Sequence, residues 1–184
     1  MSARIRFEEL ALPHRDAAYN LAYWIVRNAD DAEDVVQDAY LRAFRAFGGF
    51  KGEAMRPWLL AIVRNAAYRL LLDRKRSNNV VSYDFSNADA DAADGSDFAS
   101  PDPTAEAVLI AEGDARRLYA ALAQLPLAYR DIIVLREMEN LSYVEIAEVA
   151  GIAMGTVMSR LSRGRALLRK AIERLNAEDE PDGV

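Results

Sequence analysis

The sequence predicts an all-α protein of two small helical domains joined by a flexible acidic linker, with a helix-turn-helix in the second domain. Apolar residues recur at helical spacing on both sides of residues 77–104. The 184 residues include only 9 Gly and 6 Pro, too few for a loop-rich β protein. Residues 77–104 are rich in Ser, Asn, Asp and Ala and lack a sustained apolar period, which is typical of a flexible tether. We therefore place the domains at 1–76 and 105–176, the linker at 77–104 and an acidic tail at 177–184.

The composition argues against catalysis and against metal chemistry. The chain has no cysteine and a single histidine, His14, which excludes a disulfide framework, a thiolate zinc site and a multi-histidine metal site. It contains neither a phosphate-binding glycine motif nor a nucleophile elbow. We expect no enzymatic activity, no metal, no cofactor and no small-molecule substrate.

No export or membrane signal is visible in the sequence. No apolar run approaches the roughly 18 residues of a membrane span, and the first residues do not form a signal peptide. We therefore expect a cytoplasmic protein without membrane insertion.

The net charge of −6 argues at first against a partner as acidic as DNA. The acids are concentrated in the connector, however, because residues 77–106 carry seven acidic side chains and no basic one. Residues 1–76 carry 13 basic and 10 acidic side chains, and residues 107–175 carry 10 and 8. Both predicted helical parts are therefore slightly basic, and a nucleic acid remains a candidate partner.

The periodicity predicts three helices in residues 7–75. The first covers about 7–27, and its apolar face consists of Leu10, Ala17, Ala18, Leu21, Trp24 and Ile25. Residues 28–30 end it, and Asp30 or Asp31 caps the second helix. The buried face of that second helix is predicted to consist of Val36, Ala39, Tyr40, Ala43, Phe44 and Phe47.

The opposite face of the second helix is acidic but contains one leucine. Its members are Asp34, Gln37, Asp38 and Leu41. Periodicity alone leaves two interpretations open: an ordinary solvated face with one stray apolar residue, or a docking patch for a basic partner helix with Leu41 as its apolar anchor.

A glycine-containing loop at residues 47–53 is predicted to expose aromatic rings near Lys51, and a third helix begins near Pro57. The core face of this helix is predicted to consist of Leu59, Ile62, Val63, Ala66 and Leu70. Trp58, Asn65 and Arg69 share the opposite face, and residues 56–76 carry six bases and one acid. Such a face suits single-stranded nucleic acid, although a generic basic helix explains the same pattern.

The C-terminal half opens with a predicted helix of about 104–124 and a second helix from Pro126 to about Met138. Ser142 and Glu145 then have capping-box spacing, which predicts the start of a short helix over about 143–149. Gly151 provides a turn, and a long helix follows over about 154–175. Short helix, glycine turn and long helix form a helix-turn-helix in outline.

The last helix separates an apolar face from a basic and hydroxyl-bearing face. Its inward face consists of Val157, Leu161, Gly164, Leu168, Ile172 and Leu175. Its outward face consists of Ser159, Ser162 and Arg163, flanked by Met158, Arg160, Arg165 and Arg169. Arginine and serine are suited to reading base edges in a major groove, which favours DNA binding over an amphipathic helix that packs on a protein partner.

Three motifs resemble the conserved regions of bacterial RNA polymerase sigma factors. Residues 31–40, DAEDVVQDAY, resemble the second conserved region. Phe50-Lys51-Gly52 and residues 57–65, PWLLAIVRN, resemble the adjoining promoter-melting regions. Residues 141–147 and 155–161 resemble the fourth conserved region. With two domains and an acidic linker, the chain resembles the short extracytoplasmic-function (ECF) class of the sigma-70 family.

The resemblance implies a factor that binds core RNA polymerase and directs promoter-specific transcription initiation. It implies that core polymerase docks on Asp34, Gln37, Asp38 and Leu41. It implies that the minus-ten element is held at Phe50, Lys51, Trp58, Asn65 and Arg69. It implies that the minus-thirty-five element is read by Met158, Ser159, Ser162 and Arg163, with Arg160 and Arg165 near phosphates. An anti-sigma factor is expected as a further partner.

A rival interpretation is a helix-turn-helix transcriptional regulator that acts without core polymerase. It explains residues 104–175 but assigns no work to the acidic face or to the Trp58–Asn65 face. One residue also departs from the family pattern, since many relatives carry Asp where this chain has Arg69. The promoter, the activating stimulus and the identity of the anti-sigma factor do not follow from the sequence.

Overall fold

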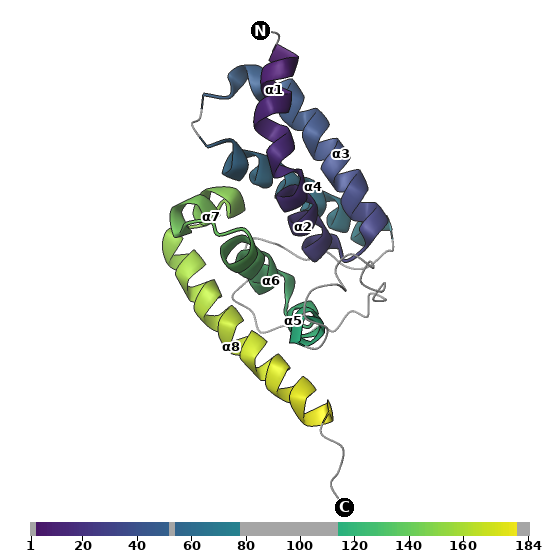
Figure 1. Ribbon diagram of the computed structural model, residues 1–184, viewed down its shortest axis with the longest axis vertical. Helices are drawn as coiled ribbons and strands as arrows, with labels where there is room; N and C mark the ends of the chain where they lie inside the picture. Colours follow the sequence, from purple (N-terminus) through teal and green to yellow (C-terminus); the bar gives the residue numbers. More distant parts are fainter. Residues whose placement is uncertain (1–2, 52–53, 78–113, 180–184) are drawn as a thin grey trace, which may run out of the picture. The chain divides into compact units, whose positions relative to one another are not determined.

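The computed structural model describes residues 3–51, 54–77 and 114–179, and all regular structure within them is helical. These residues form two compact units, each drawn largely from one half of the chain (Figure 1). The all-α prediction with two helical domains is confirmed. Apart from Ser77, the predicted linker lies outside the described residues, as do residues 105–113 and the end of the predicted tail.

The N-terminal unit is a bundle around three mutually packed helices. Its elements are α1 (Ala3–Ala11), the 3₁₀ turn η1 (Leu12–His14), α2 (Arg15–Val26), α3 (Ala29–Ala46), the 3₁₀ turn η2 (Phe47–Gly49) and α4 (Met55–Ser77). Helices α2, α3 and α4 all contact one another, and α1 packs on α4 (Figure 1). The fully buried side chains at their centre include Leu21, Ile25, Leu59, Leu60 and Val63.

The prediction of one continuous helix over 7–27 is wrong. Two helices are separated by η1, which contains Pro13. Proline has no backbone N–H and its ring clashes with the carbonyl four residues earlier, so the α-helix cannot continue through it. The change of direction also exposes Leu10, while Phe7 and Ala11 are buried in its place.

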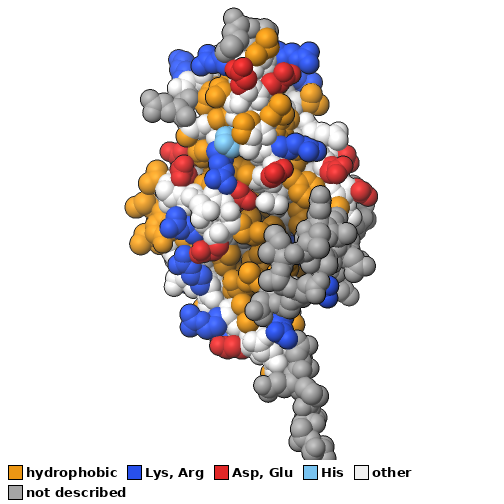
Figure 2. All heavy atoms as spheres, viewed as in Figure 1, with side chains coloured by type: hydrophobic (Ala, Val, Ile, Leu, Met, Phe, Trp, Pro, Cys, Tyr) orange, Lys and Arg blue, Asp and Glu red, His pale blue; other side chains and the backbone are white. Residues whose placement is uncertain are grey.

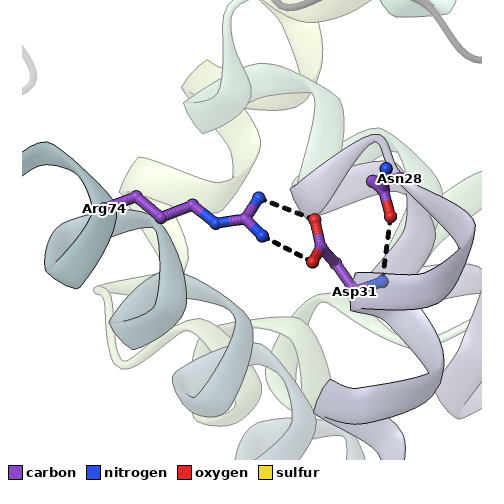
Figure 3. Close-up of polar contacts among 3 residues, drawn as sticks. All are labelled: Asn28, Asp31 and Arg74. Carbon is purple, nitrogen blue, oxygen red and sulfur yellow. Dashed lines mark hydrogen bonds and ion pairs between the residues drawn. The ribbon is translucent and has the colours of Figure 1, made fainter. Parts of the chain in front are cut away.

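The start of α3 is capped by Asn28, not by Asp30 or Asp31. The Asn28 side-chain oxygen accepts a hydrogen bond from the backbone N–H of Asp31 at 3.0 Å. The Asp31 carboxylate is thereby left for Arg74, whose Nη1 and Nη2 donate to Oδ2 and Oδ1 at 2.6 and 2.5 Å (Figure 3). This two-pronged ion pair joins the first turn of α3 to the last part of α4.

An aromatic cluster attaches α1 to α3. The Phe7 ring lies edge-on to Tyr40, Phe44 and Phe47, with ring centroids 5.3 to 6.3 Å apart. The Tyr40 hydroxyl donates a hydrogen bond to the carbonyl oxygen of Ala11 at 2.8 Å. Edge-to-face packing of this kind adds to the energy of apolar burial and fixes the direction in which α1 runs.

The C-terminal unit contains the predicted helix-turn-helix. Its elements are α5 (Asp114–Ala123), α6 (Leu127–Ile133), the π-helical turn η4 (Val134–Met138), α7 (Tyr143–Ala150) and α8 (Met154–Asp179). Helices α5 and α6 both pack on α8.

The local signals read from the sequence are confirmed in this unit. The Glu145 N–H donates to Ser142 Oγ at 3.2 Å, and the Ser142 N–H donates to Glu145 Oε2 at 2.7 Å, which is a capping box at the start of α7. Gly151 has a φ of 65°, in the left-handed region that glycine adopts with the least strain, and it turns the chain into α8. The helix-turn-helix therefore follows from residues next to one another in the sequence.

Gly164 allows α8 to approach α6 closely. A Cβ atom at this position would lie 2.8 Å from Ile133 Cδ1 and 3.3 Å from Tyr129 Cβ, and Ile133 is itself buried. We expect Gly164→Ala to destabilise the chain by about 1 to 2 kcal/mol because overpacking outweighs the better helix propensity of alanine. Gly155→Ala is the matched control, since a Cβ there meets nothing within 4 Å. Urea denaturation followed by circular dichroism measures both, and equal stabilities would contradict this account of the α6–α8 contact.

Candidate partner and nucleic-acid interfaces

The acidic face predicted on the second helix lies on the exposed side of α3. Asp34, Gln37 and Leu41 are exposed, and Asp38 is half-buried between them. Leu41 is 57% exposed, whereas the residues on the other side of the same helix are buried in the core. An apolar side chain with carboxylates around it is the arrangement expected of a protein-docking anchor. We call these four residues the α3 face.

One ion pair modifies the charge of the α3 face. Arg42 Nε lies 2.6 Å from Asp38 Oδ2, and both side chains are more than 40% exposed. Exposed pairs spaced four residues apart on a helix contribute little energy. The Asp38 carboxylate therefore remains available to a basic partner.

Phe44 was predicted in the core but is 44% exposed. It follows Leu41 by three residues, so the two apolar side chains are neighbours on the helix surface. Its ring contacts Phe7 on one side, with centroids 5.4 Å apart, and is open to solvent on the other. Periodicity predicts Phe44 on the buried face, but the packing of α1 decides which part of the ring is covered.

The loop before α4 forms a row of aromatic rings. Phe50 stacks on Phe47 with centroids 6.0 Å apart, and it is tilted against Trp58 with centroids 4.8 Å apart. Phe47 is buried, as predicted for the apolar face of the second helix, whereas Phe50 and Trp58 are half-buried. The half-buried pair offers partly exposed ring surface on which a nucleobase can stack.

Polar and basic groups follow the loop rings of this row along the chain. Lys51, Asn65 and Arg69 are all exposed. Asn65 and Arg69 are separated by one helical turn on α4, and Trp58 lies about two turns before Asn65. Trp58, Asn65 and Arg69 therefore share one side of α4.

The long helix α8 presents the predicted outward face to solvent. Met158, Ser159, Ser162 and Arg163 are exposed, and Arg160 is half-buried. Ser159 Oγ donates a hydrogen bond to the Thr156 carbonyl oxygen at 3.0 Å. Figure 2 shows Lys and Arg side chains gathered along the part of the surface where Figure 1 places α8.

A shallow hollow of about 430 Å³ lies between Tyr143 and α8. The α8 residues that line it include Met158, Ser162, Arg165 and Arg169. These positions follow one another at spacings of four, three and four, so they form a single stripe along the helix. We call them the α8 stripe.

Arg165 on the α8 stripe has an intramolecular partner that the sequence did not indicate. Its Nε and Nη2 donate to Oε1 of Glu137 at 3.0 and 2.6 Å. The hydrogen bond to Glu137 raises the pKa of Arg165 above its ordinary value, which shows that the pair favours the charged guanidinium. The two residues are 28 positions apart, which is beyond the reach of any periodic pattern.

Neighbouring groups fix the surroundings of this pair. The Arg136 guanidinium lies 5.0 Å from the ring centre of Tyr143, and its Nη1 donates to the Leu141 carbonyl oxygen at 2.7 Å. The Arg136 side chain is therefore held by the turn before α7.

No group of three or more acidic or histidine side chains within residues 3–51, 54–77 and 114–179 is arranged to hold a metal ion. Burial, together with the positive charge of Arg56, lowers the pKa of His14 below its ordinary value, so this imidazole is neutral at pH 7.

None of the helices described is long and apolar enough to cross a membrane.

Comparison with known families and relatives agrees with this organisation. Residues 10–77 match the family model of sigma-70 region 2, and residues 115–168 match that of sigma-70 region 4. The ECF sigma factor SigE of Mycolicibacterium smegmatis is 33% identical over 172 residues, which are 94% of this chain and 63% of SigE. The sigma-H factor of Pseudomonas aeruginosa is 32% identical over 94% of this chain and 89% of that protein.

Solved structures show the same fold. The sigma factor RpoE of Bartonella quintana, in complex with the anti-sigma factor NepR, superposes with a TM-score of 0.68 and 26% identity over 91% of this chain and 97% of RpoE. CnrH, in complex with the cytosolic domain of CnrY, gives a TM-score of 0.64 over 93% of this chain and 90% of CnrH.

A region 2 followed by a region 4 in one all-helical chain defines an RNA polymerase sigma factor, a class of DNA-recognition proteins that regulate transcription. The chain belongs to the extracytoplasmic-function class of the sigma-70 family.

Proposed function

We propose that three surfaces divide the work of a sigma factor that binds core RNA polymerase and directs promoter-specific initiation. The single observation that carries this division is the exposure of Leu41 among acids on α3, in a chain whose other half holds the helix-turn-helix. A helix-turn-helix regulator without polymerase is not favoured, because it leaves both the α3 face and the region 2 match without a function.

The α3 face binds core polymerase in this proposal. Asp34 and Asp38 meet basic side chains of the partner and steer its approach, Gln37 hydrogen-bonds at the interface, and Leu41 fills an apolar pocket. Leu41 supplies apolar area, while the charges around it supply orientation and on-rate.

The aromatic row and α4 hold the minus-ten element. A base that leaves the duplex can stack against Phe50 and Trp58, which are already fixed against each other at 4.8 Å. Lys51 and Arg69 neutralise phosphates, and Asn65 hydrogen-bonds a base edge. Arg69 adds a cation where many relatives have Asp, so its contact is to the DNA backbone.

The outward face of α8 reads the minus-thirty-five element as a major-groove helix. Met158 provides an apolar contact, Ser159 and Ser162 adapt to base edges, and Arg163 forms bidentate hydrogen bonds with guanine. Arg160 and Arg165 hold phosphates and set the register of the helix.

The proposal includes the wider setting of the protein. The domains comprise residues 1–76 and 105–176, which the matches at 10–77 and 115–168 support. An anti-sigma factor as partner is supported by the complex of RpoE with NepR. The protein acts in the cytoplasm and has no enzymatic activity, in line with the chemistry of DNA recognition alone.

Run-off transcription tests the function directly. The purified chain is mixed with bacterial core polymerase and fragments of the genome that encodes it, and transcripts with discrete start sites are expected. Core polymerase alone is the control. DNA binding without association with core polymerase would instead support the regulator.

We expect Arg163→Ala to reduce promoter-specific transcription about tenfold or more, because one bidentate base contact contributes about 1 to 3 kcal/mol of discrimination. Affinity for core polymerase should not change, since α8 and α3 belong to different units. Arg116→Ala is the matched control, since it removes the same charge from an exposed position on α5. Run-off yield and co-elution with core polymerase measure the two effects, and loss of core binding in Arg163→Ala would contradict the assignment.

A further inference from the structure

The ion pair between Glu137 and Arg165 occupies a position where the proposed function requires a free cation. Glu137 lies in the π-helical turn η4 and Arg165 in α8, and both hydrogen bonds end on the same carboxylate oxygen, Oε1. A carboxylate and a phosphate present the same kind of acceptor to a guanidinium. Glu137 therefore satisfies Arg165 in the way that a DNA phosphate would.

Arg165 belongs to the surface assigned to DNA. It is a member of the α8 stripe, three residues after Ser162 and four before Arg169. The stripe and Tyr143 line the hollow on this side of the unit. An Arg165 side chain released from Glu137 thus remains beside the residues that read the minus-thirty-five element.

The pair is also open to exchange. The side chains of Arg165 and Glu137 are 47% and 48% exposed, so water and ions reach both groups. An exposed ion pair is held weakly and is screened by salt. A DNA phosphate at the same place can compete for the guanidinium, because the neighbouring phosphates add to the negative electrostatic potential there.

We propose that Glu137 is an internal competitor of DNA phosphate for Arg165 and lowers the affinity of the helix-turn-helix for duplex DNA. The inference rests on the proposed function of α8. The pair has no net charge, so it releases no counterion when DNA binds, whereas Arg165 alone would release about one. Glu137 thus makes binding depend more on base contacts and less on the backbone charge that every sequence shares.

The test is the salt dependence of binding in Glu137→Gln. Holoenzyme is reconstituted from core polymerase and the full chain, and the probe is a fluorescent duplex of a promoter fragment recovered by run-off transcription, cut upstream of the minus-ten element. Anisotropy is measured between about 50 and 200 mM salt. We expect binding about threefold tighter at the lower salt and a slope of log K against log salt that is steeper by about 0.9.

Two variants make the result specific. Glu173→Gln removes the same charge from an exposed site on α8 that is eight residues, or about 12 Å, beyond Arg165, where screening is strong, and we expect the wild-type slope. The double variant, Glu137→Gln with Arg165→Gln, should bind no more tightly than Arg165→Gln alone, because without Arg165 there is no guanidinium for Glu137 to pair with. A merely structural role of Glu137 would leave the slope unchanged.

The outcomes are distinguishable. Equal slopes in Glu137→Gln, Glu173→Gln and the wild type would overturn the inference while leaving the proposed function intact. A wild-type holoenzyme that binds the fragment no better than a scrambled duplex would overturn the assignment of α8 to the minus-thirty-five element, and the inference with it.

Discussion

Leu41→Ala or Asp38→Arg is expected to remove most of the affinity of this sigma factor for core RNA polymerase. Leu41 is 57% exposed on α3 and is the apolar member of an otherwise polar face. Truncating a central interface anchor costs about 2 kcal/mol or more, which is about a 30-fold loss of affinity. Asp38→Arg places a positive charge before a basic partner and leaves Arg42 without its ion pair, so the loss should be at least as large. Fluorescence titration with labelled core polymerase measures both.

Leu12→Ala is the matched control for this experiment. Leu12 is 55% exposed, nearly as much as Leu41, but it lies in η1 and not on α3. We expect the control to bind core polymerase like the wild type. Unchanged binding of Leu41→Ala and Asp38→Arg, with normal circular dichroism, would show that the docking surface lies elsewhere.

Trp58→Ala is expected to leave core binding intact and to reduce promoter opening about tenfold or more. Trp58, near the start of α4, is in contact with Phe50 of the preceding loop, with ring centroids 4.8 Å apart, and both rings are half-buried. Stacking of one base on an aromatic ring contributes about 1 to 3 kcal/mol, and this variant removes the larger of the two rings. The permanganate reactivity of unpaired thymines measures the open complex.

Two comparisons separate melting from other defects. Trp58→Phe keeps an aromatic face and should retain part of the opening activity. A promoter with a preformed bubble should restore most of the transcription by Trp58→Ala, because the strands are already apart. Normal permanganate reactivity in Trp58→Ala would contradict the assignment, as would a defect that persists on the bubble.

The fold was predictable where the signals are local. The capping box of Ser142 and Glu145 and the turn at Gly151 depend on residues within a few positions of one another, and the structure has both. Pro13 also indicates a helix break, but the apolar period continues across this residue, so periodicity alone predicts a single helix. The N-cap of α3 was missed because Asn28 competes with two aspartates close behind it.

The candidate surfaces were predictable as faces of single helices and not as contacts between helices. Helical spacing placed Leu41 among acids and Ser162 beside Arg163 without any tertiary knowledge. The partial exposure of Phe44 depends on where α1 packs, and the Glu137–Arg165 pair joins residues far apart in the chain. Assignments to polymerase and to each promoter element came from the resemblance and stay predictions for the experiments above.

The two-pronged pair of Asp31 and Arg74 has a mechanical consequence. Arg74 is three residues before Ser77, where α4 ends and the chain continues toward the C-terminal unit. A pull on the chain between the two units enters α4 at this last turn, which an isolated helix would resist least. The ion pair transmits this force from α4 to the capped start of α3. The Asp31 side chain that makes the pair is only 15% exposed (Figure 3). The N-terminal unit thus resists unravelling at the C-terminal end of α4.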